Sequence, residues 1–469
     1  MRNISDNLAN KYSINNTTCC AISTPPVPGG LGVIRISGPQ AADIADRVFH
    51  SFSGKVLKTL GGYRALYGTV CDDRGEKIDD CVALNFTAPK SYTGENVVEL
   101  SCHGGVYILR KVLEALYKAG AVPAGKGEFT RRAFMNGKLD LAQAESVMDV
   151  ISAQSEQAVR AANSVKDGRL SAAIKSIRDE LTDICAHLAA WADYPDDDIP
   201  QISEDNLKER ISSVKSELKK LIDSFDSGMI LKEGITAAIV GKPNSGKSTL
   251  MNMLAGCEKS IVTSFAGTTR DVVEEKIMLG DIPVTIADTA GIRDTDNPVE
   301  RIGVELARGR MKSSQAVLAV FDSSEPLDDE DRRLMEELKG VCCIAVINKS
   351  DLESRIETDE IKRNFDHCVY ISAANNEGID AIADEFRKIF ISDRLDLSAG
   401  ILYSERQKND ALNAFECMEE AENALFGGFT LDAVTVSCEA AVSALFELTG
   451  EKASEAVIDQ VFEKFCVGK

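Results

Sequence analysis

The pattern of apolar and polar positions divides the chain into stretches of different character. Up to about residue 130, short apolar runs alternate with turn-forming residues, which is typical of a small α/β unit. From Phe134 to about residue 225 the chain is rich in Ala, Glu, Gln, Lys and Leu and almost free of Gly and Pro, so helices are expected there. Residues 229–392 return to apolar runs bounded by glycines, and helical composition resumes after them. The pattern predicts a multidomain protein with α/β and all-α parts.

The first stretch is predicted to form strands and two helices. The Pro- and Gly-rich residues 25–30 are a strong turn signal, and Asp72-Asp73-Arg74-Gly75 separates two alternating runs, as in a hairpin. Strands are expected at residues 18–24, 31–37, 62–71, 77–86 and 97–102, and helices at 41–49 and 105–118.

The helical sequence lies on both sides of the inserted α/β stretch. One apolar helix face, with residues three and four positions apart, is formed by Ile174, Ile177, Leu181, Ile184, Leu188 and Trp191. Later helices are expected at 403–425, 431–448 and 454–465, where Ile458, Val461 and Phe465 share a face. The two flanks are therefore predicted to pack as one bundle. The predicted domains are 1–130, 131–228, 229–392 and 393–469, with the second and fourth forming this discontinuous bundle.

A glycine-rich loop follows the first strand expected in the inserted domain. Residues 241–248, GKPNSGKS, fit the P-loop pattern Gly-x-x-x-x-Gly-Lys-[Ser/Thr], between the strand-like run 235–240 and a helix-forming run. In such a loop, main-chain N–H groups at a helix start point at phosphates. Lys247 is predicted to reach the β- and γ-phosphates, and Ser248 to bind Mg²⁺.

Four later segments complete the pattern of a guanine-nucleotide site. They supply a hydroxyl for Mg²⁺, a carboxylate at a strand end, and a carboxylate, Asp351, that can accept two N–H bonds from guanine, which adenine cannot offer. The segments are Gly267-Thr268-Thr269, Asp288-Thr289-Ala290-Gly291, Asn348-Lys349-Ser350-Asp351 and Ser372-Ala373-Ala374. In order and spacing they resemble small GTPases of the translation-associated type.

One position departs from the signalling GTPases, which carry a water-positioning Gln directly after the Asp-x-x-Gly segment. Here that residue is Ile292, which cannot hydrogen-bond water. Another group is therefore expected to position the attacking water, and a bound monovalent cation can supply positive charge beside the phosphates.

Composition narrows the functional classes. The chain has 469 residues, of which 44 % are hydrophobic and 27 % charged, as in ordinary globular proteins with several domains. No run approaches the roughly 18 apolar residues of a membrane span, and the first residues are polar, so we expect an untargeted cytoplasmic protein. The net charge of −21 argues against a broad nucleic-acid-coating surface. The 13 cysteines form no Cys-x-x-Cys pair, so a zinc site is not expected.

Further segments carry a resemblance to one family over nearly the whole chain. They are GVIRISG at 32–38, TGE at 93–95, HGG at 103–105, GEFTRRAF at 127–134, KLDLAQAE at 138–145 and CVGK at 466–469. Together with the nucleotide motifs, they closely resemble the MnmE (TrmE) family of tRNA modification GTPases. The resemblance implies an N-terminal α/β domain that binds folate and forms a homodimer, a helical bundle, and an inserted P-loop domain of the Ras-like type.

The resemblance implies a folate site whose contacts match Arg35, Glu99, Lys138 and Lys469. Arg35 and Lys138 can pair with the glutamate carboxylates of folate, and Glu99 can accept from its pterin N–H groups. The implied ligand is 5,10-methylenetetrahydrofolate, with 5-formyltetrahydrofolate as an analogue. Cys466 matches the family's terminal thiol, but whether it is a nucleophile, a pocket residue or only a helix-end residue stays open.

The resemblance also implies a K⁺ site beside the Mg²⁺-nucleotide. Asn244, Thr263, Phe265 and Thr268 match its ligands, Thr269 joins Ser248 at Mg²⁺, and Glu300 matches the carboxylate that positions the attacking water, so the implied catalytic residues are Glu300 and Lys247. Ala374 replaces the family's usual basic residue, with little effect expected on base contacts. The full set expected to contact GTP is Asn244, Ser245, Gly246, Lys247, Ser248, Thr249, Thr263, Ser264, Phe265, Ala266, Gly267, Thr268, Thr269, Asp288, Thr289, Ala290, Gly291, Asn348, Lys349, Asp351, Ser372, Ala373 and Ala374.

The implied activity is K⁺-stimulated GTP hydrolysis coupled to tRNA modification. With the FAD protein MnmG (GidA), in a heterotetramer, the protein would add a carboxymethylaminomethyl or aminomethyl group to C5 of wobble uridine 34 of certain tRNAs. The amine donor, glycine or ammonium, stays open. One alternative is a ribosome-assembly GTPase switch like Era or Der, although neither an appended RNA-binding module nor a second G domain is recognisable. Another is a stand-alone folate enzyme regulated by its G domain.

Overall fold

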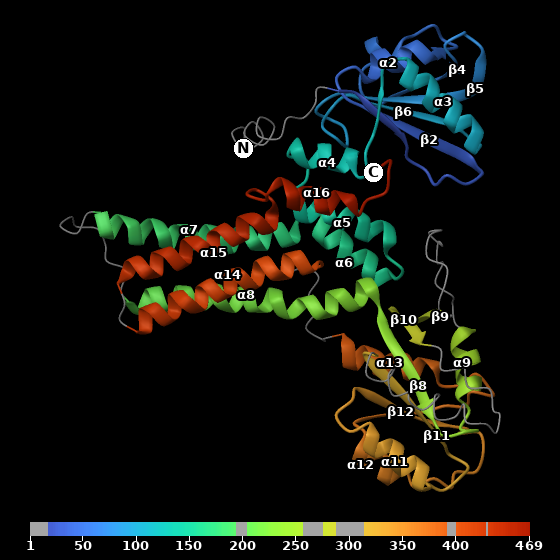
Figure 1. The fold of residues 1–469 in the computed structure, drawn as a ribbon, viewed down its shortest axis with the longest axis vertical. Coiled ribbons are helices and arrows are strands. Elements are labelled where there is room, and N and C mark those ends of the chain that lie inside the picture. The colour runs from blue at the N-terminus through green and yellow to red at the C-terminus, as the bar shows by residue number, and fades with distance from the viewer. Residues whose placement is uncertain (1–16, 194–203, 257–274, 288–313, 392–399, 428–429) are drawn as a thin grey trace. The chain divides into compact units, whose positions relative to one another are not determined.

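The computed structural model describes residues 17–193, 204–256, 275–287, 314–391, 400–427 and 430–469. By internal contacts the chain divides into two units (Figure 1). Unit 1 comprises Met1–Met148, Ile174–Lys215 and Asp410–Lys469, and unit 2 comprises Asp149–Ala173 and Ser216–Asn409. No helix in the described part of the chain combines the length and apolarity that crossing a bilayer requires.

Unit 1 contains a mixed sheet built largely from antiparallel pairs. Every strand expected from the sequence is present, and only β1 and β7 pair in parallel. β3 and β7 were not expected, because runs of two or three residues are too short to show alternation. The order is β3 (Phe49–Ser51), β4 (Arg64–Cys71), β5 (Lys77–Phe86), β6 (Val97–Gly104), β2 (Gly29–Ser37), β1 (Cys19–Ile22) and β7 (Val122–Pro123).

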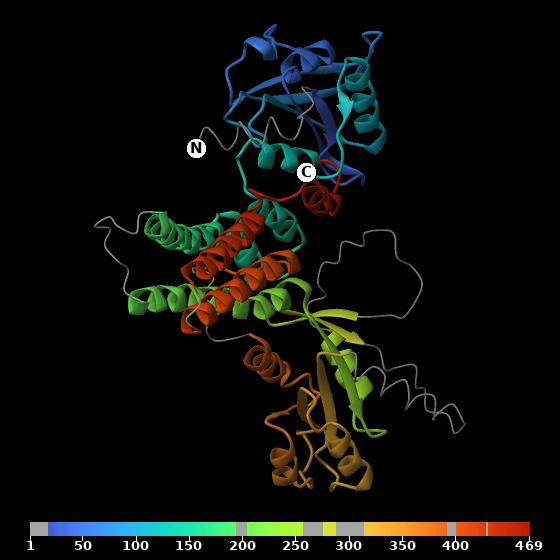
Figure 2. The same ribbon diagram turned by 60° about the vertical axis from the view of Figure 1, so that its left-hand side comes forward.

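Two helices cover one face of this sheet. α2 (Ala41–Val48) and α3 (Val106–Lys118) lie on the same side in both views (Figures 1 and 2). Their apolar faces bury Ile44 and Leu109 against alternate strand residues such as Ile36 and Leu100, all at most 2 % exposed. Because side chains alternate across a strand, the intervening residues, including Arg35 and Glu99, lie on the opposite face.

Helical segments from before and after unit 2's sheet pack together in unit 1. α4 (Glu128–Met135), α5 (Leu141–Ser152) and α16 (Glu455–Glu463) share one core, which includes Phe134, Leu141 and Phe462. Ion pairs join Arg178 to Glu451 at 2.5 Å and Lys215 to Glu422 at 2.6 Å. The remaining helices are α7 (Arg169–Asp193), α8 (Glu204–Glu233), α14 (Glu405–Phe426) and α15 (Leu431–Thr449).

These contacts confirm that the two helical flanks form one bundle. The predicted apolar face of α7 is buried from Ile174 to Leu188, with no member above 4 % exposed. The side chain of Trp191 lies outside the described residues. The domain boundaries expected from the sequence remain predictions, since the division into units follows contacts rather than those boundaries.

Unit 2 contains a six-stranded sheet with helices on both faces. All neighbouring strands are parallel except β9, which is antiparallel to β10. α9 (Lys247–Ala255) and α13 (Ile379–Phe390) pack on one face, and α11 (Asp329–Glu337) and α12 (Thr358–Asn364) on the other. The order is β13 (His367–Tyr370), β12 (Cys343–Asn348), β11 (Ala316–Asp322), β8 (Ile235–Gly241), β10 (Ile282–Ala287) and β9 (Glu275–Leu279).

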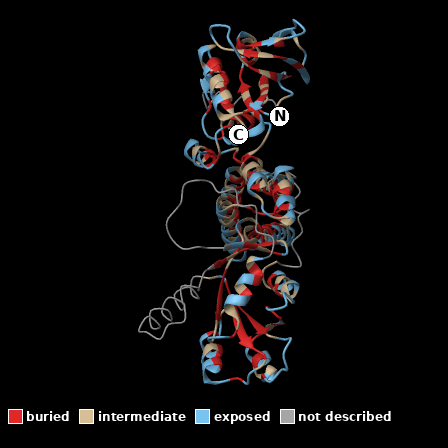
Figure 3. Ribbon diagram, turned by 90° about the vertical axis from the view of Figure 1, so that its right-hand side faces the viewer, coloured by how far each residue is buried: buried red, intermediate tan, exposed pale blue. Residues whose placement is uncertain are grey.

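Burial on both faces explains the continuous apolar runs of the central strands. Every residue of β11 and β12 is buried, as the red strands in Figure 3 show. In such sheets ligands bind beyond the carboxyl ends of the strands. The loops that follow β8, β11 and β12 are therefore where a site is expected.

The helices of unit 2 include α6 (Glu156–Lys166). The chain segments that lead into and out of the six-stranded sheet contact these helices. Lys232, near the end of α8, pairs with Asp149 at 2.8 Å and donates to the Tyr403 carbonyl oxygen at 3.0 Å. Tyr403 is 1 % exposed, and its hydroxyl donates to the Ala158 carbonyl oxygen at 3.5 Å. Both chain connections of the sheet, before β8 and after α13, are thus fixed to the helices.

Arg132 of α4 has a deeply buried side chain, 6 % exposed, that pairs with two carboxylates. Its Nε donates to Glu128 at 2.9 Å, and its Nη1 donates to Glu95 at 3.1 Å and to the Thr17 carbonyl oxygen at 2.9 Å. A paired charge in this position stabilises only while both partners are present, because either carboxylate alone would be largely desolvated.

We expect Arg132→Met to lower the free energy of unfolding of unit 1 by about 3 kcal/mol, since it leaves two largely buried carboxylates unpaired. Hydrogen exchange of the β2 and β6 amides measures this loss. The control is Lys111→Met, which removes an exposed pair with Glu114 in the same unit and should change the value by less than about 0.5 kcal/mol. Equal effects of the two substitutions would contradict the assignment of Arg132 as a core ion pair.

Candidate functional site

The P-loop lies between β8 and α9, as the sequence predicts. Gly246 has φ +96°, and a Cβ there would lie 2.1 Å from Asn348 Nδ2. Gly241 is as confined, because its Cβ would lie 2.5 Å from the Val320 carbonyl oxygen. The first turn of α9 leaves main-chain N–H groups without intrahelical partners, which favours an anion at this position. Asn244, Ser248 and Thr249 are exposed at the same loop.

Lys247 is held against the loop by its own side chain. Its Nζ donates to the carbonyl oxygens of Gly241 at 2.9 Å and Lys242 at 2.8 Å. The ammonium therefore lies over the main chain of the loop rather than in solvent. This is where the positive charge has to be for a phosphate bound at the start of α9.

Asn348 joins the P-loop to the segment after β13. Its Nδ2 donates to the Ser245 carbonyl oxygen at 3.0 Å, and its Oδ1 accepts from the Ala373 N–H at 3.1 Å. The Ser372 hydroxyl donates to Asp351 Oδ1 at 2.6 Å and so orients the carboxylate. The structure thus brings together three motifs that are far apart in sequence, and the predicted base-reading Asp351 lies with them.

Lys242 is a residue of this site that the sequence did not single out. Its side chain is 9 % exposed and pairs with Asp331 at 2.9 Å and Asp328 at 3.1 Å, both at the start of α11. Burial opposes its charge, but the hydrogen bonds to these carboxylates outweigh burial and raise the pKa of Lys242. Three consecutive acidic residues opening a helix were the only signal in the sequence, and such residues are common at helix starts.

Several predicted site residues lie outside the described residues. They are the expected Mg²⁺, K⁺ and water-positioning groups beyond the P-loop, together with their neighbours, and they stay predictions: Thr263, Ser264, Phe265, Ala266, Gly267, Thr268, Thr269, Asp288, Thr289, Ala290, Gly291 and Glu300.

A second group of predicted residues meets in unit 1. Arg35 of β2 and Glu99 of β6 face each other in the strand register, and Arg35 Nε donates to Glu99 Oε1 at 2.8 Å. The Arg35 guanidinium lies 5.4 Å from the ring centre of Tyr92 and 5.3 Å from that of Phe129. The sequence analysis did not single out Tyr92, and Phe129 appeared there only as part of the segment 127–134, because neither ring belongs to an apolar pattern that points to Arg35.

The residues 466–469 are held beside this pair. The Phe129 N–H donates to the main-chain oxygen of Lys469 at 3.0 Å, and the Gly127 N–H donates to that of Cys466 at 3.3 Å. Gly468 has φ +99°, and a Cβ there would lie 2.2 Å from the Ile22 carbonyl oxygen. Phe129 therefore links the two parts of this group, because its ring contacts the Arg35 guanidinium, which pairs with Glu99, and its main-chain N–H bonds Lys469.

Lys138 reaches the same region from the turn after α4. Its Nζ donates to the Pro89 carbonyl oxygen at 3.4 Å. Pro89 belongs to the loop that also carries Tyr92, whose hydroxyl bonds the Thr130 hydroxyl at 2.9 Å. The four predicted ligands therefore belong to segments that contact one another through Tyr92 and Phe129. Cys466 is partly exposed next to them, and its role stays open.

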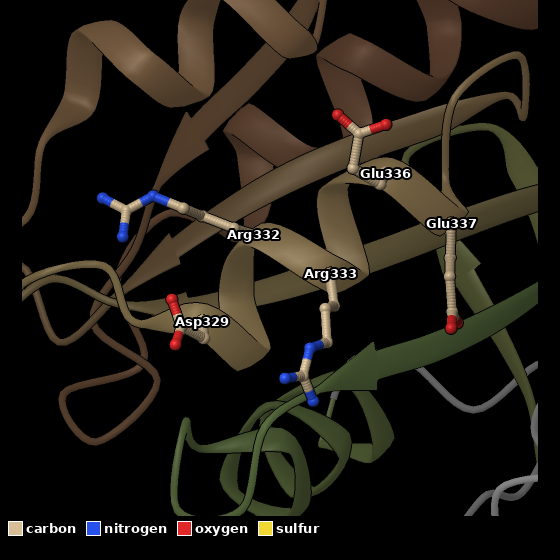
Figure 4. Close-up of a pocket in the computed structure, with 5 residues that line it drawn as sticks. All are labelled: Asp329, Arg332, Arg333, Glu336 and Glu337. Carbon is tan, nitrogen blue, oxygen red and sulfur yellow. The ribbon is translucent and has the colours of Figure 1, made fainter.

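A shallow cavity of about 510 Å³ lies elsewhere in unit 2, on the surface of α11. Its lining side chains, labelled in Figure 4, point in different directions around the helix, and one of them, Arg332, pairs with Glu360 at 3.0 Å. The polar groups of these side chains do not converge on one point, so the cavity is not a candidate site. The lining residues are Asp329, Arg332, Arg333, Glu336 and Glu337.

Comparisons with known proteins show the family of the chain. Residues 18–138 match the family model for the GTP-binding protein TrmE N-terminus, and residues 141–466 match that for the MnmE helical domain. The chain is 39 % identical over 455 residues to the tRNA modification GTPase MnmE of Clostridioides difficile (strain 630), covering 96 % of this chain and 99 % of the relative. The chain belongs to the MnmE family. It is also 36 % identical over 458 residues to the MnmE of Bacillus subtilis (strain 168), covering 96 % and 100 %.

The MnmE helical-domain match extends on both sides of the six-stranded sheet, in accord with a bundle built from two separated segments. Some solved structures match part of this chain. Era of Aquifex aeolicus bound to GDP·AlF₄⁻ is 26 % identical, with 39 % of this chain and 67 % of that chain covered and a TM-score of 0.27. The G domain of the T. maritima FeoB iron transporter is 22 % identical, with 33 % and 97 % covered and a TM-score of 0.26.

We expect Gly246→Ala to weaken guanine-nucleotide binding at least about tenfold. The left-handed backbone and the contact with Asn348 Nδ2 together cost more than about 1.4 kcal/mol, the equivalent of a factor of ten. Fluorescence titration with a labelled guanosine diphosphate measures the loss. Gly256→Ala at the other end of α9 is the control, because its Cβ would come no closer than 3.3 Å to any atom. Unchanged affinity in Gly246→Ala would show that the loop does not hold the nucleotide as assigned.

Proposed function

We propose that this chain is a K⁺-stimulated GTPase that acts in the modification of tRNA. The observation that carries the proposal is the Asn348 side chain, which bonds the P-loop and the 372–374 segment at once and so sets Asp351 beside a phosphate-binding loop. A carboxylate in that place accepts the two N–H groups of a guanine edge. The names of the MnmE relatives support the assignment to tRNA modification.

The described residues fit Mg²⁺-nucleotide and K⁺. Ser248 lies exposed in the first turn of α9, where its hydroxyl can ligate Mg²⁺, and Lys247 lies over the loop where it can neutralise phosphate charge. Asn244 is exposed, with φ +62°, so its side-chain carbonyl oxygen is accessible to an ion. A K⁺ there would supply the charge that an arginine finger supplies in other GTPases. Thr263, Phe265 and Thr268 would complete its shell, and Glu300 would position the water.

The second site fits a reduced folate. Arg35 is already paired with Glu99, so the pair presents both N–H donors and a carboxylate acceptor, a combination that suits the donor and acceptor edge of a pterin. The exposed Tyr92 ring offers a face next to the pair, while the buried Phe129 ring packs against the Arg35 guanidinium. Lys138 and Lys469 are then the cations left for the glutamate carboxylates, which changes the part first expected of Arg35.

The proposed overall reaction uses both sites. With MnmG, a homodimer of this chain would add a carboxymethylaminomethyl or aminomethyl group to C5 of wobble uridine 34, with 5,10-methylenetetrahydrofolate as the one-carbon donor. Folate supplies the carbon when bound, and the described residues bind and orient it. GTP hydrolysis in unit 2 would drive the conformational cycle.

We expect GTP hydrolysis to be at least about tenfold faster in KCl than in NaCl at the same ionic strength, because a bound K⁺ stabilises the negative charge that develops on the phosphates in the transition state. Asn244→Ala should lose this difference, because it removes a ligand of the ion. Steady-state phosphate release measures the rates. Asn252→Ala, an exposed asparagine on α9, is the matched control and should keep the stimulation. Equal rates in both salts for the wild type would remove K⁺ from the proposal and leave a GTPase of another mechanism.

We expect Glu99→Gln to weaken binding of 5-formyltetrahydrofolate about tenfold or more, since an amide replaces one carboxylate oxygen with a donor that faces the pterin N–H groups. Calorimetric titration measures the affinity, and GTP hydrolysis should stay unchanged. Asp73→Asn, which removes an exposed pair with Lys118 in the same unit, is the control. Wild-type affinity in Glu99→Gln would place folate elsewhere.

A further inference from the structure

Asp322 is a buried carboxylate outside the recognised nucleotide motifs. It ends β11 and lies opposite Asn348 in the parallel register of β11 and β12. Only 4 % of the residue is exposed. A carboxylate at the carboxyl edge of the sheet, directly beside the base-recognition segment, is expensive to bury without partners.

Two groups of donors hold this carboxylate. Its Oδ1 accepts from the Ser324 N–H at 2.9 Å and from the Ser324 hydroxyl at 2.6 Å, and its Oδ2 accepts from Lys349 Nζ. Burial alone would raise the pKa of Asp322, but the hydrogen bonds from Lys349 and Ser324 outweigh burial and lower it. The carboxylate is therefore ionised, and its second oxygen is committed to Lys349.

Lys349 is fixed at its other end as well. Its carbonyl oxygen accepts from the Ser323 hydroxyl at 2.8 Å, and its backbone has φ +62°, an unusual value for a residue with a side chain. Two consecutive residues at the end of β11 thus hold Lys349: Asp322 binds its ammonium and Ser323 binds its main chain. The methylene stem between these two points has little freedom left.

We propose that Asp322 is a positioning residue for the guanine base, and that it acts through Lys349. With both ends held, the stem of Lys349 forms a preorganised apolar platform for one face of the ring, while Asp351 reads the edge of the ring. Preorganisation strengthens binding because the rotamer entropy of the lysine is lost on folding rather than on association. The inference rests on the proposed guanine-nucleotide site and assigns a second group of residues to it.

Asp322→Asn separates this role from a purely structural one. The asparagine carbonyl oxygen can still accept from Ser324 and keep the turn after β11, but the NH₂ group that replaces Oδ2 cannot accept from the ammonium of Lys349. We expect a labelled guanosine diphosphate to dissociate about five- to tenfold faster from the variant, while the thermal midpoint without nucleotide stays unchanged. The control is Asp281→Asn, which removes an exposed pair with Arg387 in the same domain and should leave dissociation unchanged.

A double-mutant cycle with Lys349→Met identifies the route. If Asp322 acts through Lys349, adding Asp322→Asn to Lys349→Met should change dissociation by less than about twofold. Additive effects, or wild-type dissociation from Asp322→Asn, would overturn the inference and leave the nucleotide site intact. The cycle remains informative if Asp322→Asn proves less stable. An effect of lower stability on dissociation would be the same with and without Lys349→Met, so the two effects would be additive. If the wild-type chain bound guanosine and adenosine diphosphates equally, the proposed function itself would fail.

Discussion

The two hydrogen bonds of the Asn348 side chain are the interaction on which the rest of the nucleotide site depends. One amide joins the P-loop to the segment after β13, and neither loop has another described contact that fixes their separation as directly. The bond requires glycine at position 246, since any Cβ there would lie on the amide nitrogen. A constraint on one main-chain angle therefore decides whether phosphate and base can be recognised by one rigid surface.

Around this bond the edge of the parallel sheet is braced by buried ion pairs. Lys242 and Lys349 both turn back toward carboxylates rather than outward: Lys242 toward Asp331, in α11, and Lys349 toward Asp322, the last residue of β11. Pairs of this kind contribute little net stability compared with apolar packing, but they fix geometry, because an unpaired charge at the same depth is costly. The segment from β11 to α11 thus supports the nucleotide loops without belonging to any nucleotide motif.

In unit 1, too, contacts between segments that are distant in sequence bring the predicted ligands together. Its cluster joins a cross-strand pair, two aromatic rings and the main chain of residues 466–469. Gly127 and Gly468 permit the close approach, because in both cases a Cβ would meet neighbouring atoms at 3.0 Å or less. The buried Arg132 network holds α4 against the sheet, and α4 carries Phe129. The cluster is consequently as dependent on the late segment of the chain as on the early strands.

The sequence by itself determined the elements and the chemistry that short motifs encode. Alternation placed β2, β4, β5 and β6, a three-and-four spacing placed the buried face of α7, and the P-loop and Asn-Lys-x-Asp patterns located the phosphate and base segments, because these signals are local. What only the tertiary structure decided are the partners that come from distant strands and loops. Strand register and loop packing bring Arg35 and Glu99 together beside Tyr92 and Phe129. They likewise bring Asp322 to Lys349. Long-range contacts of this kind leave no periodic trace in the sequence, since any of many acidic or aromatic residues could have satisfied the same side chain.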